Sequence, residues 1–205
     1  MIRLEIDGGL WTATLDRPEK ANSLTRAMLA ELSEIAGRAA AEGARALVLT
    51  GTGKVFSAGA DLDEARAGLA TDPLWEELSG RIARLPCLTI AALNGTLAGG
   101  AMGMALACDL RLAVPGANFF YPVMKLGFLP QPSDPARLAA LVGPARARMI
   151  LMAGARVGAE EALAWGLIDR IAAPEALLAE ARTLAEAPLA ASAAHVAAIK
   201  GMIPG

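Results

Sequence analysis

The residues best suited to chemistry in this chain are two adjacent glycines at the start of an apolar helix. Residues 93–109 read LNGTLAGGAMGMALACD, in which a turn containing Gly99 and Gly100 runs directly into the apolar segment. A helix that begins there presents backbone N–H groups without acceptors inside the helix, so an oxygen atom of a ligand could bind against the bare main chain. We therefore predict that the reactive centre lies at this turn.

A second glycine-rich turn, GTGKVFSAGAD, occupies residues 51–61. The phosphate-binding loop of nucleotide hydrolases needs a glycine five residues before Gly53 and a Ser or Thr after Lys54, and neither is present. The dinucleotide-binding pattern also fails, because Phe56 stands where its last glycine belongs. We expect no nucleotide hydrolysis at this turn.

Composition predicts one globular domain without a polyanionic partner. The 205 residues are 55% apolar and 20% charged, and the formal charge of −2 gives no field that attracts nucleic acid or an anionic membrane surface. Cys87 and Cys108 lack CxxC or metal-type spacing, so we expect neither a disulfide framework nor a metal site. Charges at positions 3, 5 and 7 argue against a signal peptide. These features favour a reducing compartment, the cytoplasm.

Residues 85–108 carry no charged side chain and are long enough to span a bilayer. Pro86, the Asn94-Gly95 turn pair and the glycines argue against one continuous helix. We therefore predict a strand, a turn and a buried helix here, and no interaction with a membrane.

The elements that must position the two turns alternate between strands and helices. Strands are predicted at 46–50 and 88–93, directly before the two turns. Further strands are predicted at 2–6, 10–15, 109–114 and 167–171, and helices at 23–41, 61–70, 74–85, 136–141, 144–153, 159–165, 174–187 and 189–203. This pattern predicts a single α/β domain over residues 1–205, with a core at about 1–187 and a C-terminal helix at 188–205.

Three segments together resemble the enoyl-CoA hydratase/isomerase (crotonase) family: RALVLTGTGKVFSAGADLDE at 45–64, LNGTLAGGAMGMALACDLRLA at 93–113 and FFYPVMKLGFLP at 119–130. The resemblance implies an α/β fold, a crotonase-like superhelix of ββα units, with a shortened C-terminal helical region because the chain stops near Gly205. It implies an acyl-CoA substrate, with coenzyme A as part of the substrate and no permanently bound cofactor. It also implies a homo-oligomer, a trimer or hexamer, although the usual trimer cannot be assumed for the shorter chain.

The family holds the thioester oxygen with two backbone N–H groups, and the matching segments place these donors at Ala60 and Gly100. An enolate-like oxyanion needs preorganised donors at close range, and small residues let the main chain approach it. The alternatives are an ordinary turn at Ala60 and tight helix packing at Gly100, and we favour the oxyanion hole.

The resemblance also places the coenzyme A contacts. Relatives wrap CoA around the first glycine-rich turn, so Ser57, Ala58 and Leu62 are expected to meet adenine and pantetheine through backbone groups. Lys20 lies where relatives meet the CoA phosphates, and a solvated surface lysine is an equally good interpretation of it.

The resemblance fails where hydratases of the family carry their two catalytic glutamates. Alignment on the flanking residues places the first at Gly103 and the second at Val123. Neither side chain can transfer a proton, and general acid–base catalysis requires a titratable group within hydrogen-bond reach. Two-glutamate hydration is therefore not expected, and isomerase, decarboxylase or hydrolase chemistry fits better.

Asp134 is the candidate for a replacement base. Relatives that isomerise, dehalogenate or hydrolyse CoA esters carry an aspartate eight positions beyond the second glutamate, which is Gln131 here, and Asp134 lies three residues further on. Asp134 could accept a proton if its loop turns inward, but Ser133-Asp134-Pro135 is also typical of a helix N-cap followed by proline, and we favour the cap. Tyr121 and Lys125 flank the missing glutamate and are fallback candidates.

The other side chains near these motifs have mainly structural interpretations. The expected lining of the thioester site is Met102, Met104, Val123, Met124 and Phe128. Methionines in such places are more often flexible core filling. His195, the one histidine, lies on the predicted C-terminal helix, where a structural or exposed role is favoured.

Two functions remain open from the sequence. The first is an acyl-CoA isomerase or lyase that stabilises a thioester enolate at the Ala60 and Gly100 N–H groups. The second is a non-catalytic acyl-CoA-binding or partner subunit, which the residues at Gly103 and Val123 would permit.

Overall fold

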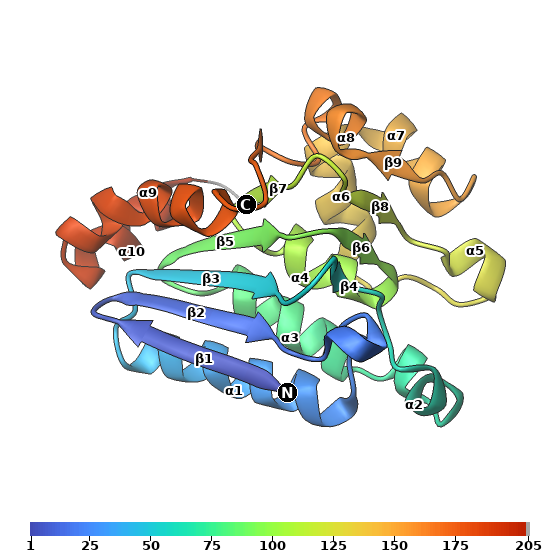
Figure 1. Ribbon diagram of the computed structural model, residues 1–205, viewed down its shortest axis with the longest axis horizontal. Helices are drawn as coiled ribbons and strands as arrows, with labels where there is room; N and C mark the ends of the chain where they lie inside the picture. Colours follow the sequence, from blue (N-terminus) through green and yellow to red (C-terminus); the bar gives the residue numbers. More distant parts are fainter. Residues whose placement is uncertain (204–205) are drawn as a thin grey trace.

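The computed structural model describes residues 1–203 and contains two β-sheets surrounded by helices (Figure 1). The larger sheet has the order β1-β2-β3-β5-β7-β10, and all its neighbouring strands are parallel except the β1/β2 hairpin. Its strands are β1 Ile2–Asp7, β2 Leu10–Leu15, β3 Ala46–Gly51, β5 Leu88–Leu93, β7 Leu110–Ala113 and β10 Arg170–Ile171. The predicted strands are therefore confirmed in place, with β10 shorter than expected.

The smaller sheet has the order β4-β6-β8-β9. Its strands are β4 Val55–Ser57, β6 Thr96–Ala98, β8 Asn118–Phe120 and β9 Val157–Gly158. Each of β3, β5 and β7 leads through a short connection into a strand of this second sheet and then into helices, which is the predicted repeat of ββα units. The sequence analysis missed these strands, because segments of two or three residues are too short to show a periodic pattern.

Helices cover both faces of the larger sheet (Figure 1). The helices are α1 Arg26–Ala41, α2 Leu62–Arg66, α3 Leu74–Ala83, α4 Met102–Leu106, α5 Val123–Leu126, α6 Asp134–Val142, α7 Pro144–Leu151, α8 Ala159–Trp165, α9 Leu177–Ala190 and α10 Ala193–Met202, with 3-10 turns η1 Pro18–Lys20, η2 Leu69–Thr71 and η3 Gly99–Ala101. The pair α1 and α3 packs on one face and α9 on the other. The strands between them, β3 and β5, are mostly apolar and almost entirely buried, as in other parallel sheets that are covered on both faces.

Helix α1 begins three residues later than the sequence analysis predicts. The Thr25 hydroxyl accepts a hydrogen bond from the Met28 N–H (3.2 Å) and caps the helix. Leu24, expected inside the helix, is instead fully buried in an isolated parallel bridge with Ala60. The segment before α1 therefore supports the first glycine-rich turn.

The predicted helix boundary at residues 187/188 is wrong. Helix α9 continues through Pro188 to Ala190, and α10 starts after Ser192, whose hydroxyl accepts the His195 N–H (3.2 Å). The Arg45 guanidinium reaches across from the sheet to the carbonyl oxygens of Leu189 and, at 3.3 Å, of Ala191. This side chain satisfies carbonyl groups that the end of α9 leaves free.

Helix α10 is fastened to the sheet by one lysine. The Lys200 ammonium donates to the Cys87 carbonyl oxygen (2.9 Å) and to Asp109 Oδ2 (2.7 Å). Asp109 also accepts from the Thr89 N–H (2.8 Å), and both Cys87 and Cys108 are buried free thiols. The C-terminal helix is thus bonded to the main chain at Cys87 and to Asp109, which follows Cys108.

The uncharged stretch at 85–108 does not form one helix. It folds into β5, β6, η3 and α4, as the breakers in its sequence predict. Among residues 1–203, no helix is both long enough and apolar enough to cross a membrane.

Candidate functional site

The candidate site lies where three neighbouring strands of the smaller sheet end. Strands β4, β6 and β8 are parallel, with Ser57 paired to Leu97 and Ala98 paired to Phe120. The chain therefore leaves the sheet side by side in three places, near the labels β4, β6 and β8 in Figure 1. The carboxyl ends of parallel strands are a common place for ligand sites in α/β proteins.

The two glycine-rich turns meet at this edge through bare backbone. Gly59 and Gly99 both have positive φ, +96° and +59°, which favours glycine over any other residue. A Cβ atom on Gly59 would lie 3.1 Å from the Ala98 carbonyl oxygen and 3.5 Å from the Gly99 Cα. The predicted donors Ala60 and Gly100 each follow one of these glycines, so the structure brings the two turns together.

The backbone bridge between Leu24 and Ala60 leaves the Ala60 N–H free. The Leu24 N–H donates to the Gly59 carbonyl (2.7 Å), and the Asp61 N–H donates to the Leu24 carbonyl (2.9 Å). In a parallel bridge the N–H of the central residue points the other way, and the Ala60 N–H has no acceptor within residues 1–203. Ala60 is partly exposed, so a ligand oxygen could reach this donor.

Gly100 lies in the first turn of η3, where N–H groups lack acceptors within the helix. A Cβ atom here would lie 3.2 Å from the ring of Trp75, whose Nε1 donates to the Leu69 carbonyl (2.8 Å). Gly100 therefore packs tightly, as the alternative interpretation expects, and its role as an oxyanion donor stays a prediction. Trp75 closes one side of the turn and leaves the backbone as the surface that a ligand can meet.

Asp61 and Arg17 hold the Ala60 turn in place. The Arg17 guanidinium donates to Asp61 Oδ2 (2.8 Å) and to the Ser23 carbonyl (3.0 Å), and Asp61 Oδ1 accepts the Asp63 N–H (3.1 Å) at the start of α2. The Arg17 guanidinium lowers the pKa of Asp61. Asp61 is thus a permanent anion that fixes the residue before it, Ala60.

Asn22 is a site residue that the sequence analysis missed. It is fully buried with φ of +51°, accepts the Arg17 N–H (2.9 Å) and donates to the carbonyls of Thr52 (2.9 Å) and Val55 (2.7 Å). Its own carbonyl accepts the Ser57 hydroxyl (2.8 Å). Asparagine adopts the left-handed conformation more readily than most residues, and this preference could have indicated a turn at this position.

The predicted coenzyme A residues lie around the same turn. Lys20, Ala58 and Leu62 are exposed, Leu62 by 72%, whereas Ser57 is fully buried. The Ala58 N–H donates to the Ala21 carbonyl (3.0 Å), which places Lys20 beside the turn. An extended ligand could therefore meet Lys20 and the Ala58 backbone together.

Asp134 lies directly against Gly103. A Cβ atom on Gly103 would be 2.9 Å from Asp134 Oδ1 and 3.1 Å from Oδ2, so the carboxyl group occupies the space of a side chain on α4. Gly103 follows Gly100 by one helical turn, which is about 5 Å along the axis. The structure therefore places a carboxyl group close to where the sequence analysis found one missing, although from a different helix.

The predicted helix-cap role of Asp134 is wrong. Helix α6 begins at Asp134 itself, Ser133 is the N-cap residue, and the structure shows no side-chain cap at this helix start. The Asp134 side chain turns inward, is 0% exposed, and accepts a hydrogen bond from the Tyr121 hydroxyl (2.9 Å) at Oδ2. Contact with a residue 13 positions away has displaced the local capping interaction.

Burial shifts the pKa of the Asp134 carboxyl group away from its ordinary value. Desolvation raises its pKa to about 6, and the Tyr121 hydroxyl opposes this rise by bonding to the carboxylate. Arg137, on the same helix, places Nη1 3.9 Å from Oδ1, and Oδ1 has no hydrogen-bond partner within residues 1–203. The group can therefore gain or lose a proton near neutral pH.

The remaining predicted residues fall into two groups. Val123 is buried, and Tyr121 is buried with its hydroxyl on Asp134, while Lys125 and His195 are exposed away from it. Met124 and Phe128 are 59% and 41% exposed on and after α5, so they line no enclosed site here. Met102 and Met104 are core residues, as the structural interpretation of the methionines expects.

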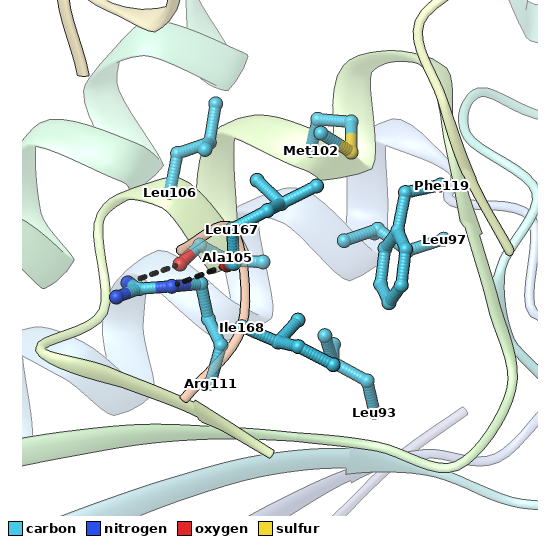
Figure 2. A pocket seen from close by; sticks show the side chains of 9 residues that line it. All are labelled: Leu93, Leu97, Met102, Ala105, Leu106, Arg111, Phe119, Leu167 and Ile168. Atoms are coloured by element: carbon cyan, nitrogen blue, oxygen red, sulfur yellow. Dashed lines mark hydrogen bonds between the residues drawn. The ribbon is translucent and has the colours of Figure 1, made fainter. Parts of the chain in front are cut away.

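A small cavity lies beside α4 and is lined mainly by apolar side chains (Figure 2). Its volume is about 10 Å³, enough for about one water molecule. Its lining consists of Leu93, Leu97, Met102, Ala105, Leu106, Arg111, Phe119, Leu167 and Ile168. The buried Arg111 guanidinium is bonded to main-chain carbonyls, including that of Leu167 (2.9 Å), so it supports the fold and has no hydrogen bond left for an acyl group.

Comparison with known proteins relates this chain to one family. The family model described as enoyl-CoA hydratase/isomerase matches residues 5–203. The chain is 35% identical over 97% of its length to carnitinyl-CoA dehydratase of Escherichia coli, and 33% identical over 88% of its length to 1,2-epoxyphenylacetyl-CoA isomerase of the same organism, covering 78% and 72% of those proteins. Some other curated relatives are covered only to 66% of their length. The crystal structure of enoyl-CoA hydratase from Bacillus anthracis superposes with a TM-score of 0.90 at 30% identity, covering 98% of this chain and 81% of that one.

Proposed function

This chain belongs to the enoyl-CoA hydratase/isomerase family, and from that premise we propose that it forms and reprotonates the enolate of an acyl-CoA thioester. The N–H groups of Ala60 and Gly100 hold the thioester oxygen. Two observations support this assignment: the turns that carry them touch through Gly59 and Gly99, and neither N–H has an evident intramolecular acceptor among residues 1–203. Each such donor contributes a few kcal/mol to an oxyanionic transition state.

Asp134 carries the proton in the proposed reaction. Its carboxylate removes a proton from the carbon next to the thioester carbonyl, and the electron pair of that C–H bond forms the enolate, whose negative oxygen the two N–H groups stabilise. The carboxylic acid then returns the proton to the enolate, at the same carbon or at a conjugated one. The observation that carries this proposal is the buried Asp134 carboxyl group packed on Gly103, one turn beyond Gly100.

A single carboxyl group favours isomerisation over hydration. Hydration needs one group to activate water and another to protonate carbon, and the second glutamate position holds the buried apolar Val123. A pKa of about 6 lets Asp134 both accept and return a proton near neutral pH. Decarboxylation and thioester hydrolysis are the other reactions that need no second glutamate.

Coenzyme A is proposed to lie along the first glycine-rich turn. Lys20 would meet its phosphates, and the backbone of Ser57, Ala58 and Leu62 its adenine and pantetheine. The exposure of Lys20, Ala58 and Leu62 beside the free Ala60 N–H supports this placement.

The alternative function is binding of acyl-CoA without turnover. It is supported by the complete burial of Asp134 and by the apolar residue at position 123. In that case Asp134 would serve only to pack α6 on α4.

Exchange of α-hydrogen for deuterium separates the two functions without knowledge of the natural acyl group. We expect the protein to catalyse this exchange in D₂O on phenylacetyl-CoA or butanoyl-CoA, followed by NMR, and Asp134→Asn to slow it by about 10²–10⁴-fold. Asp63→Asn, which changes an 87% exposed carboxylate on α2, is the matched control and should leave the rate unchanged. Exchange that persists in Asp134→Asn would show that another group is the base, and tight CoA-ester binding without any exchange would favour the binding protein.

A further inference from the structure

Three residues from three elements define the position of the Asp134 carboxyl group. Gly103 lies on α4, Tyr121 directly follows β8, and Asp134 begins α6. The side chains of Tyr121 and Asp134 are almost completely buried. Because the elements are far apart in sequence, none of the three positions is explained by its own local structure.

Gly103 provides the space for the carboxyl group. A Cβ atom there would lie 2.9 Å from Oδ1, 3.1 Å from Oδ2 and 3.3 Å from Cγ of Asp134. The first of these distances is shorter than real Cβ contacts, and the others are tight. A side chain at position 103 and the present Asp134 rotamer therefore exclude each other.

Tyr121 determines which carboxyl oxygen is free. Its hydroxyl accepts the Gln131 N–H (3.4 Å), so its single proton points to Asp134 Oδ2 (2.9 Å). Burial raises the pKa of Tyr121, which keeps this hydroxyl a donor. Oδ1 is left without a hydrogen bond, because the Arg137 guanidinium is 3.9 Å away and donates instead to the Ser79 hydroxyl (2.9 Å).

The charged groups around Asp134 change neither its hydrogen bond to Tyr121 nor its ability to bind a proton. Arg137 faces it from α6, and Glu76 faces it from α3 and is held by the Ser133 N–H (3.1 Å). Burial opposes ionisation of Glu76, but its bonds to Ser133 outweigh this and lower its pKa. Glu76 therefore stays an anion and does not compete for the proton of Asp134.

We propose that Gly103 and Tyr121 are positioning residues for Asp134: Gly103 leaves the space that a carboxyl group from α6 fills, and Tyr121 binds Oδ2 so that Oδ1 is the proton-transferring atom. The role of Oδ1 rests on the proposed function. The steric exclusion and the hydrogen bond can be tested without turnover.

A double-mutant cycle on thermal stability tests the steric part. Gly103→Ala should lower the Tm by about 5 °C in the wild-type background, because the methyl group collides with the carboxyl group. In an Asp134→Ala background the same change should be neutral or raise the Tm, since alanine is the better helix former. Equal effects in both backgrounds would overturn the proposal, whether or not the protein is an enzyme.

Moving the carboxyl group back to α4 tests its catalytic consequence. Gly103→Glu and Asp134→Ala should each slow deuterium exchange on phenylacetyl-CoA at least 100-fold, and the double variant should recover at least tenfold over Asp134→Ala. The control, Gly103→Ala with Asp134→Ala, has the same vacated space but no carboxyl group and should not recover. A folded double variant that exchanges no faster than Asp134→Ala would contradict the positional role of Gly103.

Tyr121→Phe tests the hydrogen bond. Without the hydroxyl the carboxylate loses its donor, so the titration midpoint of Asp134 should rise by about one pH unit, together with the pH profile of exchange. The midpoint can be followed in the free protein by ¹³C NMR of labelled aspartate, with the signal assigned by its loss in Asp134→Asn. An unchanged midpoint would show that Tyr121 only fills space.

Discussion

Two buried aspartates flank the proposed backbone donors, Ala60 and Gly100, and the surroundings of the two carboxyl groups shift their pKa values in opposite directions. Asp61 follows Ala60 and is bound by the Arg17 guanidinium and by the Asp63 N–H. Asp134 packs one turn beyond Gly100, and its one hydrogen bond comes from Tyr121. Accordingly the Arg17 guanidinium lowers the pKa of the first, while burial raises the pKa of the second to about 6.

The comparison shows that burial alone does not identify a reactive carboxyl group. A counterion and backbone N–H groups turn Asp61 into a fixed anion that orients a turn. Asp134 has only a long ion pair, with the Arg137 guanidinium at 3.9 Å, and caps no helix N–H, so its charged form is stabilised less than that of Asp61. What distinguishes Asp61 from Asp134, the proposed proton carrier, is the number of donors that the fold directs at each carboxyl group.

The largest difference between Asp61 and Asp134 should appear when Arg17, the counterion of Asp61, is removed. Arg17→Met leaves the Asp61 charge buried without its counterion, and we expect the free energy of unfolding to fall by about 3 kcal/mol at pH 7, measured by urea denaturation. The folded-state pKa of Asp61 is depressed, so this contribution is present above its unfolded pKa and disappears as the pH falls through the folded value.

The matched control is Arg66→Met, whose partner Asp63 is solvent-exposed on α2. It should change stability by no more than about 0.5 kcal/mol. Similar losses in both variants would mean that the Arg17–Asp61 pair is energetically an ordinary surface pair.

The second prediction concerns the pH dependence that Asp134 imposes. Its folded pKa of about 6 lies above the unfolded value of 3.8, so the folded state binds the proton more tightly and stability falls as the pH rises from about 4 to about 6. The shift amounts to about 3 kcal/mol, and Asp134→Asn should abolish it. Urea denaturation at pH 4.5 and 7.5 measures this change in the free energy of unfolding. If the change is the same in the wild-type protein and in Asp134→Asn, the pKa of Asp134 is not raised by folding.

The smallest effect is expected at Arg137. Its guanidinium lies 3.9 Å from Asp134 Oδ1 and is bonded to Ser79, so Arg137→Met should raise the titration midpoint of Asp134 by only about half a unit. The ¹³C signal of the carboxyl group reports this shift directly. A shift several times larger would make Arg137 a true counterion and remove the contrast with Asp61.

The two glycine-rich turns could be predicted from the sequence better than the surroundings of Asp134. Each turn is encoded within a few residues, and the structure brings the two together at Gly59 and Gly99, while the donor roles that the resemblance gives to Ala60 and Gly100 stay a prediction. The role of Asp134 was predicted wrongly as a cap, because its partners Tyr121 and Gly103 come from other elements and no local pattern joins them. The absence of glutamates was visible in the sequence, while the carboxyl group that fills the same space was not.

The elements of the fold also divide into those that the local sequence predicts and those that depend on contacts between distant segments. The long strands of the larger sheet and the β1/β2 hairpin follow from apolar runs and turn residues, and the structure confirms them. The short strands of the smaller sheet are fixed by pairing with neighbours distant in sequence. The end of α9, beyond Pro188, is bonded by Arg45, and helix propensity does not predict this contact between residues distant in sequence.

Because Lys200 attaches α10 to the main chain at Cys87, the rate at which the two buried cysteines react with a thiol reagent can be used to follow detachment of the C-terminal helix. Burial raises the pKa of Cys87 to about 11 and that of Cys108 to about 12, so neither thiol is ionised enough to react with a disulfide reagent while the protein is closed. Because Lys200 bonds the carbonyl of Cys87 itself, detachment of the helix is the event closest to its exposure. We therefore expect the labelling rate of Cys87 to rise in Lys200→Met, if opening of that helix exposes the thiol.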